Sequence, residues 1–154
     1  MPHPALIPFT SAEWSPITRL EFDAWLEQWC SLPNATVSMD GDYAPLLAAS
    51  DILITDGLSL LIEYQVLTKP LLFFERSGHR EFNEIGKKVL RGVHTVHSLD
   101  QARAMARRYF EGSVDPHRGC QISNVEELFG SGNSTERIIE VLRGMIDEEQ
   151  GNRR

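Results

Sequence analysis

Hydroxyl, carboxylate and glycine residues interrupt two apolar runs in the segment SDILITDGLSLLIEY. Thr55, Asp56 and Gly57 follow the first run, and Ser59 and Glu63 lie within the second. If the first run is a strand and the second a helix, the N–H groups that open the helix point toward a bound anion, which Gly57 allows to approach closely. Ser59 can donate to the same anion, and Glu63, on the same helix face, can accept from sugar hydroxyls. The pattern indicates a site for a phosphate beside a sugar.

The same residues also have a purely structural interpretation. Asp56 and Ser59 are residue types that commonly cap helices, and Glu63 would then be a solvated surface carboxylate. The pattern alone favours neither capping nor ligand binding, so both interpretations stay open.

Basic residues in two other places are candidates for phosphate chemistry. Arg76, His79 and Arg80 follow the apolar run at 70–74, and this loop would either contact a second phosphate or form a solvated connection. His3 stands between two prolines, whose rings favour an extended backbone suited to a positioned proton-transfer group. A disordered chain start is the alternative interpretation of that tripeptide.

The remaining histidines and the cysteines show no ligand pattern. His94, His97 and His117 lack metal-ligand spacing, and we interpret them as surface or incidental residues. Cys30 and Cys120 are far apart in sequence and belong to no CxxC motif, which argues against a zinc site and a disulfide framework. We therefore expect no metal and no cofactor.

Composition limits the class of protein. With 154 residues and 42% hydrophobic content, the chain suits a single domain, expected over 1–147, followed by a polar tail at 148–154. The formal net charge of −7 argues against a nucleic-acid partner, because binding to a phosphate backbone needs clustered Lys and Arg. No apolar run approaches the roughly 20 residues that span a bilayer, and we expect a cytoplasmic location.

Apolar periodicity predicts short strands that alternate with helices. Strands are predicted over 35–39, 51–55, 70–74 and 93–96, and helices over 16–29, 43–49, 58–67, 81–90, 99–110 and 134–147. Such alternation favours parallel pairing through crossover helices. The predicted fold class is α/β, with an open parallel sheet covered by helices on both faces, as in Rossmann-like folds. Ligands of such sheets bind beyond the carboxyl ends of the strands, where the candidate loops fall.

Several motifs occur in an order that resembles the C-terminal domain of the CDP-glycerol glycerophosphotransferase family, the teichoic-acid-type transferases of the GT-B class. The run YAPLLAASDILITDGLSLLIE, Tyr43 to Glu63, and then TKPLLFF, Thr68 to Phe74, are similar to its strand–turn–helix and K-P motifs. Pro2-His3-Pro4 resembles its [RK]-P-H-P motif, and Gly132 to Arg137 resembles the start of its terminal helix. The resemblance implies the C-terminal half of a GT-B fold.

The resemblance also implies an activity and residue roles. Family members transfer glycerol phosphate or a related polyol phosphate from a CDP-linked donor to a glycan or lipid-linked acceptor of the cell envelope, at the cytoplasmic face of the membrane. His3 would assist phosphoryl transfer, Thr55, Asp56 and Ser59 would engage the diphosphate, and Glu63 would bind the ribose.

The sequence departs from the family pattern at two positions and in extent. Leu58 replaces the first of two paired serines, and Met1 stands where a basic residue precedes Pro-His-Pro. The first strand and the N-terminal acceptor domain would lie upstream of residue 1, so we expect a half-enzyme, inactive alone, that pairs as a homodimer or with a separate N-terminal partner.

Two alternative functions remain open from the sequence. One is a nucleotide-sugar GT-B glycosyltransferase or a UDP-N-acetylglucosamine 2-epimerase-like domain, whose sites share the acidic ribose-binding position. The other is a catalytically silent nucleotide-binding or assembly module that keeps the fold.

Overall fold

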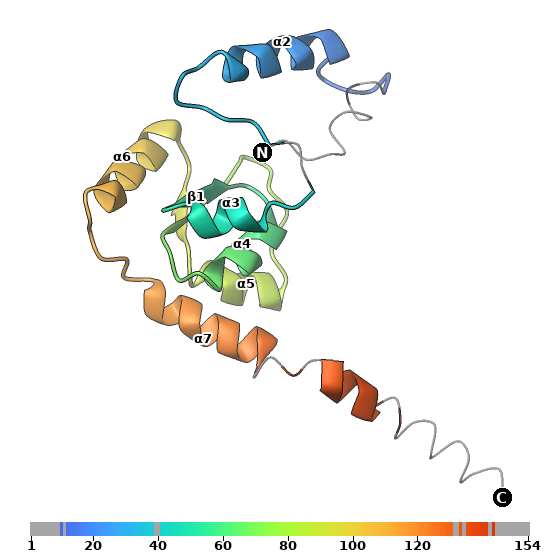
Figure 1. Ribbon diagram of the computed structural model, residues 1–154, viewed down its shortest axis with the longest axis vertical. Coiled ribbons are helices and arrows are strands. Elements are labelled where there is room, and N and C mark those ends of the chain that lie inside the picture. The colour runs from blue at the N-terminus through green and yellow to red at the C-terminus, as the bar shows by residue number, and fades with distance from the viewer. Residues whose placement is uncertain are drawn as a thin grey trace, which may run out of the picture. The chain divides into compact units, whose positions relative to one another are not determined.

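The structure is a computed structural model that describes residues 10, 12–38, 41–130, 133, 135–141 and 143 (Figure 1). The chain divides into two compact units, Met1–Ala48 and Ala49–Arg154. The single domain expected over 1–147 and its polar tail remain predictions.

The first unit contains helix α2, Arg19–Cys30. Its N-cap is Thr18, whose hydroxyl accepts from the Glu21 N–H while the Glu21 carboxylate accepts from the Thr18 N–H. This reciprocal capping box fixes the start of the helix, so the predicted start at residue 16 is wrong.

The strand predicted at 35–39 is absent from residues 35–38, and residue 39 lies outside the described residues. An isolated strand leaves its backbone hydrogen bonds unmade, and the described part of this unit contains no other strand with which it could pair. The next element is helix α3, Ala44–Ala49, which agrees with the helix predicted at 43–49.

The second unit is built on a three-stranded parallel sheet in the order β1-β2-β3. The strands are β1 (Leu53–Thr55), β2 (Leu71–Phe74) and β3 (His94–Val96). The register pairs Leu53 with Leu71 and Leu72 with His94. The α/β fold with an open parallel sheet is thus confirmed. Because β1 forms an edge of this sheet, it is only partly buried, and Ile54 is 47% exposed.

Four helices accompany the sheet: α4 (Leu58–Gln65), α5 (Glu84–Leu90), α6 (Leu99–Phe110) and α7 (Arg118–Phe129). The first three agree with predicted helices, although α5 begins later than predicted because Asn83 caps it through a bond from the Gly86 N–H. Helix α7 was not predicted. Its buried residues are Gln121 and Asn124, so its inner face lacks the apolar periodicity that predicts a helix.

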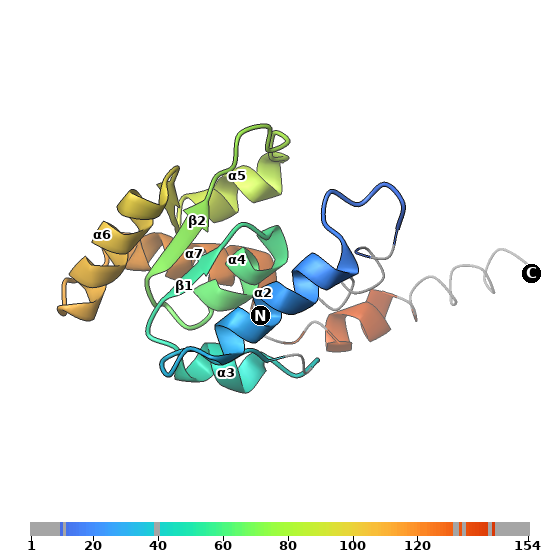
Figure 2. The same ribbon diagram turned by 90° about the horizontal axis from the view of Figure 1, so that it is seen from above.

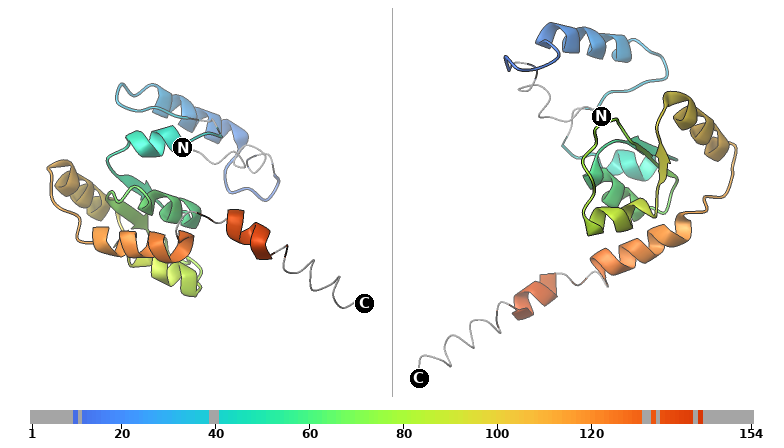
Figure 3. Two further views of the ribbon diagram at one scale, coloured as in Figure 1. Left: turned by 60° about the horizontal axis from the view of Figure 1, so that its bottom comes forward. Right: turned by 180° about the vertical axis from the view of Figure 1, so that it is seen from behind.

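The two faces of the sheet carry different helices, as Figure 2 shows for α6 on one side and α4 with α5 on the other. Side chains alternate along a strand, so Leu72 and Phe74 share one face. There they pack with Val96 and with Ala102 of α6. Helix α4 contacts β1 and β2, and α7 runs alongside α4 and α5 (Figure 3).

Buried amides, rather than apolar side chains alone, join α4, α5 and α7. Gln65 donates from Nε2 to the Val89 carbonyl (2.9 Å) and accepts at Oε1 from Asn124 Nδ2 (2.8 Å). Asn124 Nδ2 also lies 3.0 Å from the Lys88 carbonyl. These bonds give the Lys88 and Val89 carbonyls at the end of α5 a second partner, beside the backbone N–H groups of Arg91 and Gly92.

A second buried amide, Gln121, donates to the carbonyls of Gly92 (2.9 Å) and Lys69 (3.1 Å). Gly92 is required at this point, because a Cβ there would lie 2.5 Å from Gln65 Oε1 and 3.1 Å from Gln121 Cγ. We call Gln65, Gln121 and Asn124 the amide network.

In the part of the chain that the structure describes, none of the helices combines the length and the apolar character that crossing a bilayer requires.

We predict that Gln65→Met destabilises the fold by about 1–3 kcal/mol, because the Val89 carbonyl and the Asn124 amide lose a buried partner while the side chain keeps its length. Urea denaturation of both proteins measures the difference. The exposed Ser123→Ala on α7 is the control and should change stability by less than about 0.5 kcal/mol. A Gln65→Met effect as small as the control's would show that the amide network does not stabilise the unit.

Candidate functional site

The turn between β1 and α4 carries the first group of candidate residues. Gly57 is the N-cap of α4, with φ −101° and ψ 130°, and no side-chain cap bond is made there. Thr55 Oγ1 accepts from the Gly57 N–H at 3.0 Å, which fixes the turn and leaves the hydroxyl proton able to donate elsewhere. The interpretation of Asp56 as a helix cap is wrong, because its carboxylate pairs instead with a basic residue of the next loop.

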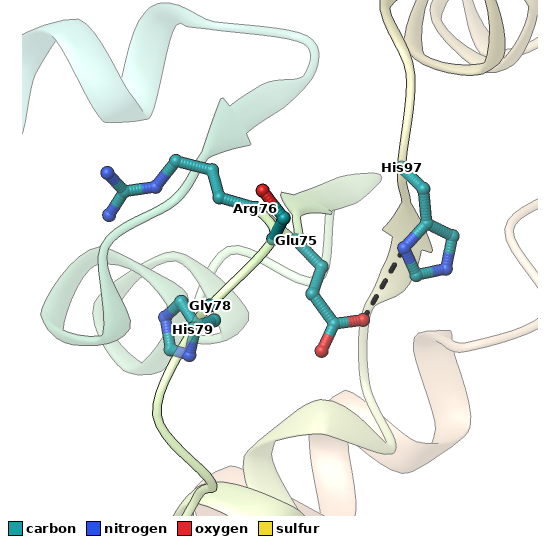
Figure 4. Close-up of a pocket in the computed structure, with 6 residues that line it drawn as sticks. Glu75, Arg76, Gly78, His79 and His97 are labelled. Carbon is teal, nitrogen blue, oxygen red and sulfur yellow. Dashed lines mark ion pairs between the residues drawn. The ribbon is translucent and has the colours of Figure 1, made fainter.

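That residue is Arg76, whose Nε lies 2.9 Å from Asp56 Oδ2. The ion pair joins the turn after β1 to the loop after β2, which are neighbours because Thr55 is in register with Phe73. Both side chains are at least half exposed. In Figure 4, Arg76 and His97 extend in opposite directions.

His79 is fixed by aromatic packing and is not part of a merely solvated loop. Its ring stacks on Phe82 with 4.7 Å between centroids and meets the edge of Phe73 at 5.3 Å. Its Nδ1 lies 2.9 Å from the Arg80 carbonyl, which can only accept, so Nδ1 carries a proton. Nε2 is therefore the atom with which the neutral ring can accept a hydrogen bond.

A depression of about 520 Å³ lies at the carboxyl ends of β2 and β3 and is lined by Glu75, Arg76, Ser77, Gly78, His79 and His97 (Figure 4). His97 Nδ1 and Glu75 Oε2 are 3.5 Å apart across it. The sequence interpretation of His97 as incidental missed this placement. The sequence does contain a sign of this placement. Glu75 comes directly after β2 and His97 directly after β3, and these two strands are neighbours in the sheet.

The structure brings some of the predicted residues together and leaves others apart. Asp56 and Arg76 meet, and His79 shares the depression with Arg76. Arg80 is exposed and is not among the lining residues. Ser59 and Glu63 lie four residues apart on α4, and both are exposed. No bond joins either of them to the depression in the described residues.

Parts of the sequence prediction fall outside the described residues or remain untested. His3 lies outside them, as do Gly132 and Ser134 of the terminal motif, whereas residues 135–141 are helical. Within the described ranges, no three His, Cys, Asp or Glu side chains gather in a way that could hold a metal ion.

The surface interpretation is wrong for His94, which is 6% exposed. Its Nε2 lies 2.9 Å from Asp115 Oδ1 and 2.9 Å from the Tyr109 hydroxyl, and the His117 ring packs edge-on against it at 4.3 Å. Burial lowers the pKa of His94, and the hydrogen bond that its ring makes to the Asp115 carboxylate opposes this shift. His94 shares a strand face with Val96, and this two-residue spacing was the available sign of burial.

The two polar loops lie at the edge of the sheet where α/β folds with parallel strands usually bind their ligands. Polar and basic residues beyond the carboxyl ends of parallel strands are typical of α/β folds that bind phosphorylated ligands at this edge. Residues 34–80 match the family model described as CDP-Glycerol:Poly(glycerophosphate) glycerophosphotransferase. The resemblance to that family is confirmed over this segment, which holds β1, α4, β2 and both candidate loops. No curated protein and no solved structure matches the chain.

We predict that His94 makes the stability of the fold fall at acidic pH. Because burial lowers the pKa of His94 below its ordinary value, the unfolded chain binds this proton more readily than the native chain. Stability contributed by His94 is present above about pH 6.5 and is lost as the pH falls further, by up to about 1.4 kcal/mol per pH unit.

Urea denaturation between about pH 7.5 and 5.5 tests this in the original chain and in His94→Gln, which should lose less stability on acidification. His97→Gln, a change at an exposed histidine, is the control and should follow the original chain. An original chain that gains stability relative to His94→Gln at acidic pH would contradict the prediction.

Proposed function

We propose that this chain is the donor-binding domain of a transferase that moves glycerol phosphate, or a related polyol phosphate, from a CDP-linked donor to a cell-envelope polymer or glycan acceptor. One observation carries the proposal. The segment that matches the glycerophosphotransferase family contains two loops that the fold brings together at the carboxyl edge of the sheet, where Asp56 pairs with Arg76.

In the proposed complex, the diphosphate of the donor lies against the start of α4 and the depression. The N–H groups that follow Gly57 have no partner inside the helix and point toward the anion, and Ser59 adds a hydroxyl. Arg76 and His79 supply positive or hydrogen-bonding groups from the neighbouring loop. Glu63, one turn beyond Ser59, accepts hydrogen bonds from the ribose hydroxyls.

In the donor, one oxygen bridges the two phosphorus atoms of the diphosphate. Transfer of the polyol phosphate breaks the bond from this oxygen to the phosphorus that carries the polyol. An acceptor hydroxyl attacks that phosphorus and CMP departs, so negative charge builds on the phosphate of CMP. Donors fixed at the start of α4 and on Arg76 stabilise that charge without rearranging. His3 remains the predicted proton-transfer group.

The acceptor would bind to other parts of such an enzyme. In the GT-B arrangement implied by the resemblance, the active site lies between two domains, with lipid-linked acceptors reached from the cytoplasmic face of the membrane. We therefore expect this chain alone to bind the donor weakly and to catalyse no transfer.

Isothermal titration of the full chain with CDP-glycerol, CDP, UDP-sugars and GDP-sugars tests the proposal. We expect weak binding of the cytidine ligands and still weaker binding of the others. Absence of binding by every cytidine ligand at millimolar concentration, with the fold intact by circular dichroism, would contradict it.

The same titration distinguishes the alternatives. A preference for uridine ligands would favour a nucleotide-sugar transferase or a UDP-N-acetylglucosamine 2-epimerase-like domain. If Asp56→Ala and Glu63→Ala changed only self-association, and not nucleotide binding, a silent assembly module would be favoured.

We predict that Gly57→Ala separates ligand binding from folding. The backbone at Gly57 suits any residue, and a Cβ there would lie 3.6 Å from Thr55 Oγ1, an ordinary contact. Stability should change by less than about 1 kcal/mol, because alanine restricts the unfolded chain but is a poorer N-cap residue than glycine. The added methyl group would lie where the anion approaches, so we expect roughly a tenfold loss of CDP affinity.

Gly119→Ala on α7 is the matched control, since a Cβ there meets no atom within 4 Å. It should stabilise the helix and leave CDP binding unchanged. Equal CDP affinity in Gly57→Ala and Gly119→Ala would show that the ligand does not approach Gly57.

A further inference from the structure

The Asp56 carboxylate does not suit the role of a direct diphosphate contact. Two negative groups repel each other, and an ionised carboxylate has only acceptor atoms to offer to phosphate oxygens, which are also acceptors. The sequence nevertheless places Asp56 within the segment that the resemblance assigns to the diphosphate. Its contact in the structure indicates a different role.

The contact of Asp56 is with Arg76, a residue 20 positions later that belongs to the loop after β2. The pair uses Nε of the guanidinium, at 2.9 Å from Oδ2. An arginine has five N–H donors in a planar fork, so the four N–H groups on the two Nη atoms take no part in this pair. Such a fork matches two oxygens of a phosphate.

Arg76 also lines the depression at the carboxyl ends of β2 and β3, beside Gly78 and His79. Asp56 thus holds the arginine on the side of the turn after β1, and the Arg76 side chain extends away from His97 (Figure 4). A pair as exposed as this one contributes little to folding stability, so stability alone does not account for it.

We propose that Asp56 is a positioning residue, which through its ion pair orients the Arg76 guanidinium so that its Nη groups bind the diphosphate of the donor. This inference rests on the proposed donor-binding function and assigns the direct contact to Arg76. An oriented arginine loses less side-chain entropy when the ligand binds than an unrestrained one, and this difference is the contribution of Asp56.

A double-mutant cycle on the full chain tests the coupling, with CDP as the ligand and cytidine as its phosphate-free counterpart. Arg76→Ala should lower CDP affinity roughly tenfold to a hundredfold, the usual range for lost charge-assisted hydrogen bonds. Asp56→Asn should lower it by roughly threefold to tenfold in the original chain, and by less than about twofold in the Arg76→Ala background.

Two further readouts separate positioning from a structural role. Cytidine affinity should stay the same in all variants, because neither side chain is assigned to the nucleoside. Asp56→Glu keeps a carboxylate that can reach Arg76, and it should recover at least part of the affinity that Asp56→Asn loses.

Arg19→Ala and Asp23→Asn on α2 provide a matched control. They disrupt another exposed Arg–Asp pair, at 2.8 Å, and should leave CDP affinity unchanged.

Each other outcome has a definite meaning. Losses that add independently in the double variant would show that Asp56 acts without Arg76 and would overturn the inference alone. Tighter CDP binding by Asp56→Asn would also overturn it, because the carboxylate would then oppose the anion. An original chain that binds no cytidine nucleotide overturns both this inference and the proposed function.

Discussion

The second unit depends on amide–carbonyl hydrogen bonds made away from water. Gln65, at the end of α4, binds the Val89 carbonyl and Asn124, and so fixes α4 against both α5 and α7. Buried amides of this kind are costly when unpaired, which makes the arrangement specific as well as stable. A further bond ties α4 to the segment before β1, because the Tyr64 hydroxyl lies 2.9 Å from Ser50 Oγ. These bonds set the direction of α4, and therefore the place where its first N–H groups point.

Strand register decides which side chains meet at the carboxyl edge. Thr55 pairs with Phe73, and Phe74 pairs with Val96, so the residues that follow these strands emerge side by side. This explains two contacts between residues that are distant in sequence, Asp56 with Arg76 and Glu75 with His97. Neither pair is stabilising enough to create the arrangement, because all four side chains are substantially exposed. The sheet places them, and their charges then pair.

The sequence predicts those parts of the unit that follow hydrophobic or capping rules. The apolar runs that end at Thr55 and before Glu75 contain strands, and Ser98, a residue type that commonly caps helices, caps α6 through a bond from the Gln101 N–H. Helix α7 escaped prediction because Gln121 and Asn124 occupy its buried face. The burial of His94 and the contact of Asp56 with Arg76 depend on packing and register between segments far apart in sequence, which no local pattern contains. The roles of Ser59, Glu63 and His3 remain predictions.

Leu58 is the residue of the turn that departs most from the family pattern, since it removes a hydroxyl at the first position of α4. In the proposed site, Arg76 of the neighbouring loop compensates for this missing hydroxyl donor. Its two Nη atoms offer four N–H groups, and its Nε is paired with Asp56. An arginine in this place does more than replace a hydroxyl, because it also neutralises charge on the diphosphate. Its long side chain costs more entropy to order than a serine, and an ion pair that orders it beforehand reduces that cost. On this argument, the departure at Leu58 and the pairing of Asp56 with Arg76 belong to one arrangement for binding an anion.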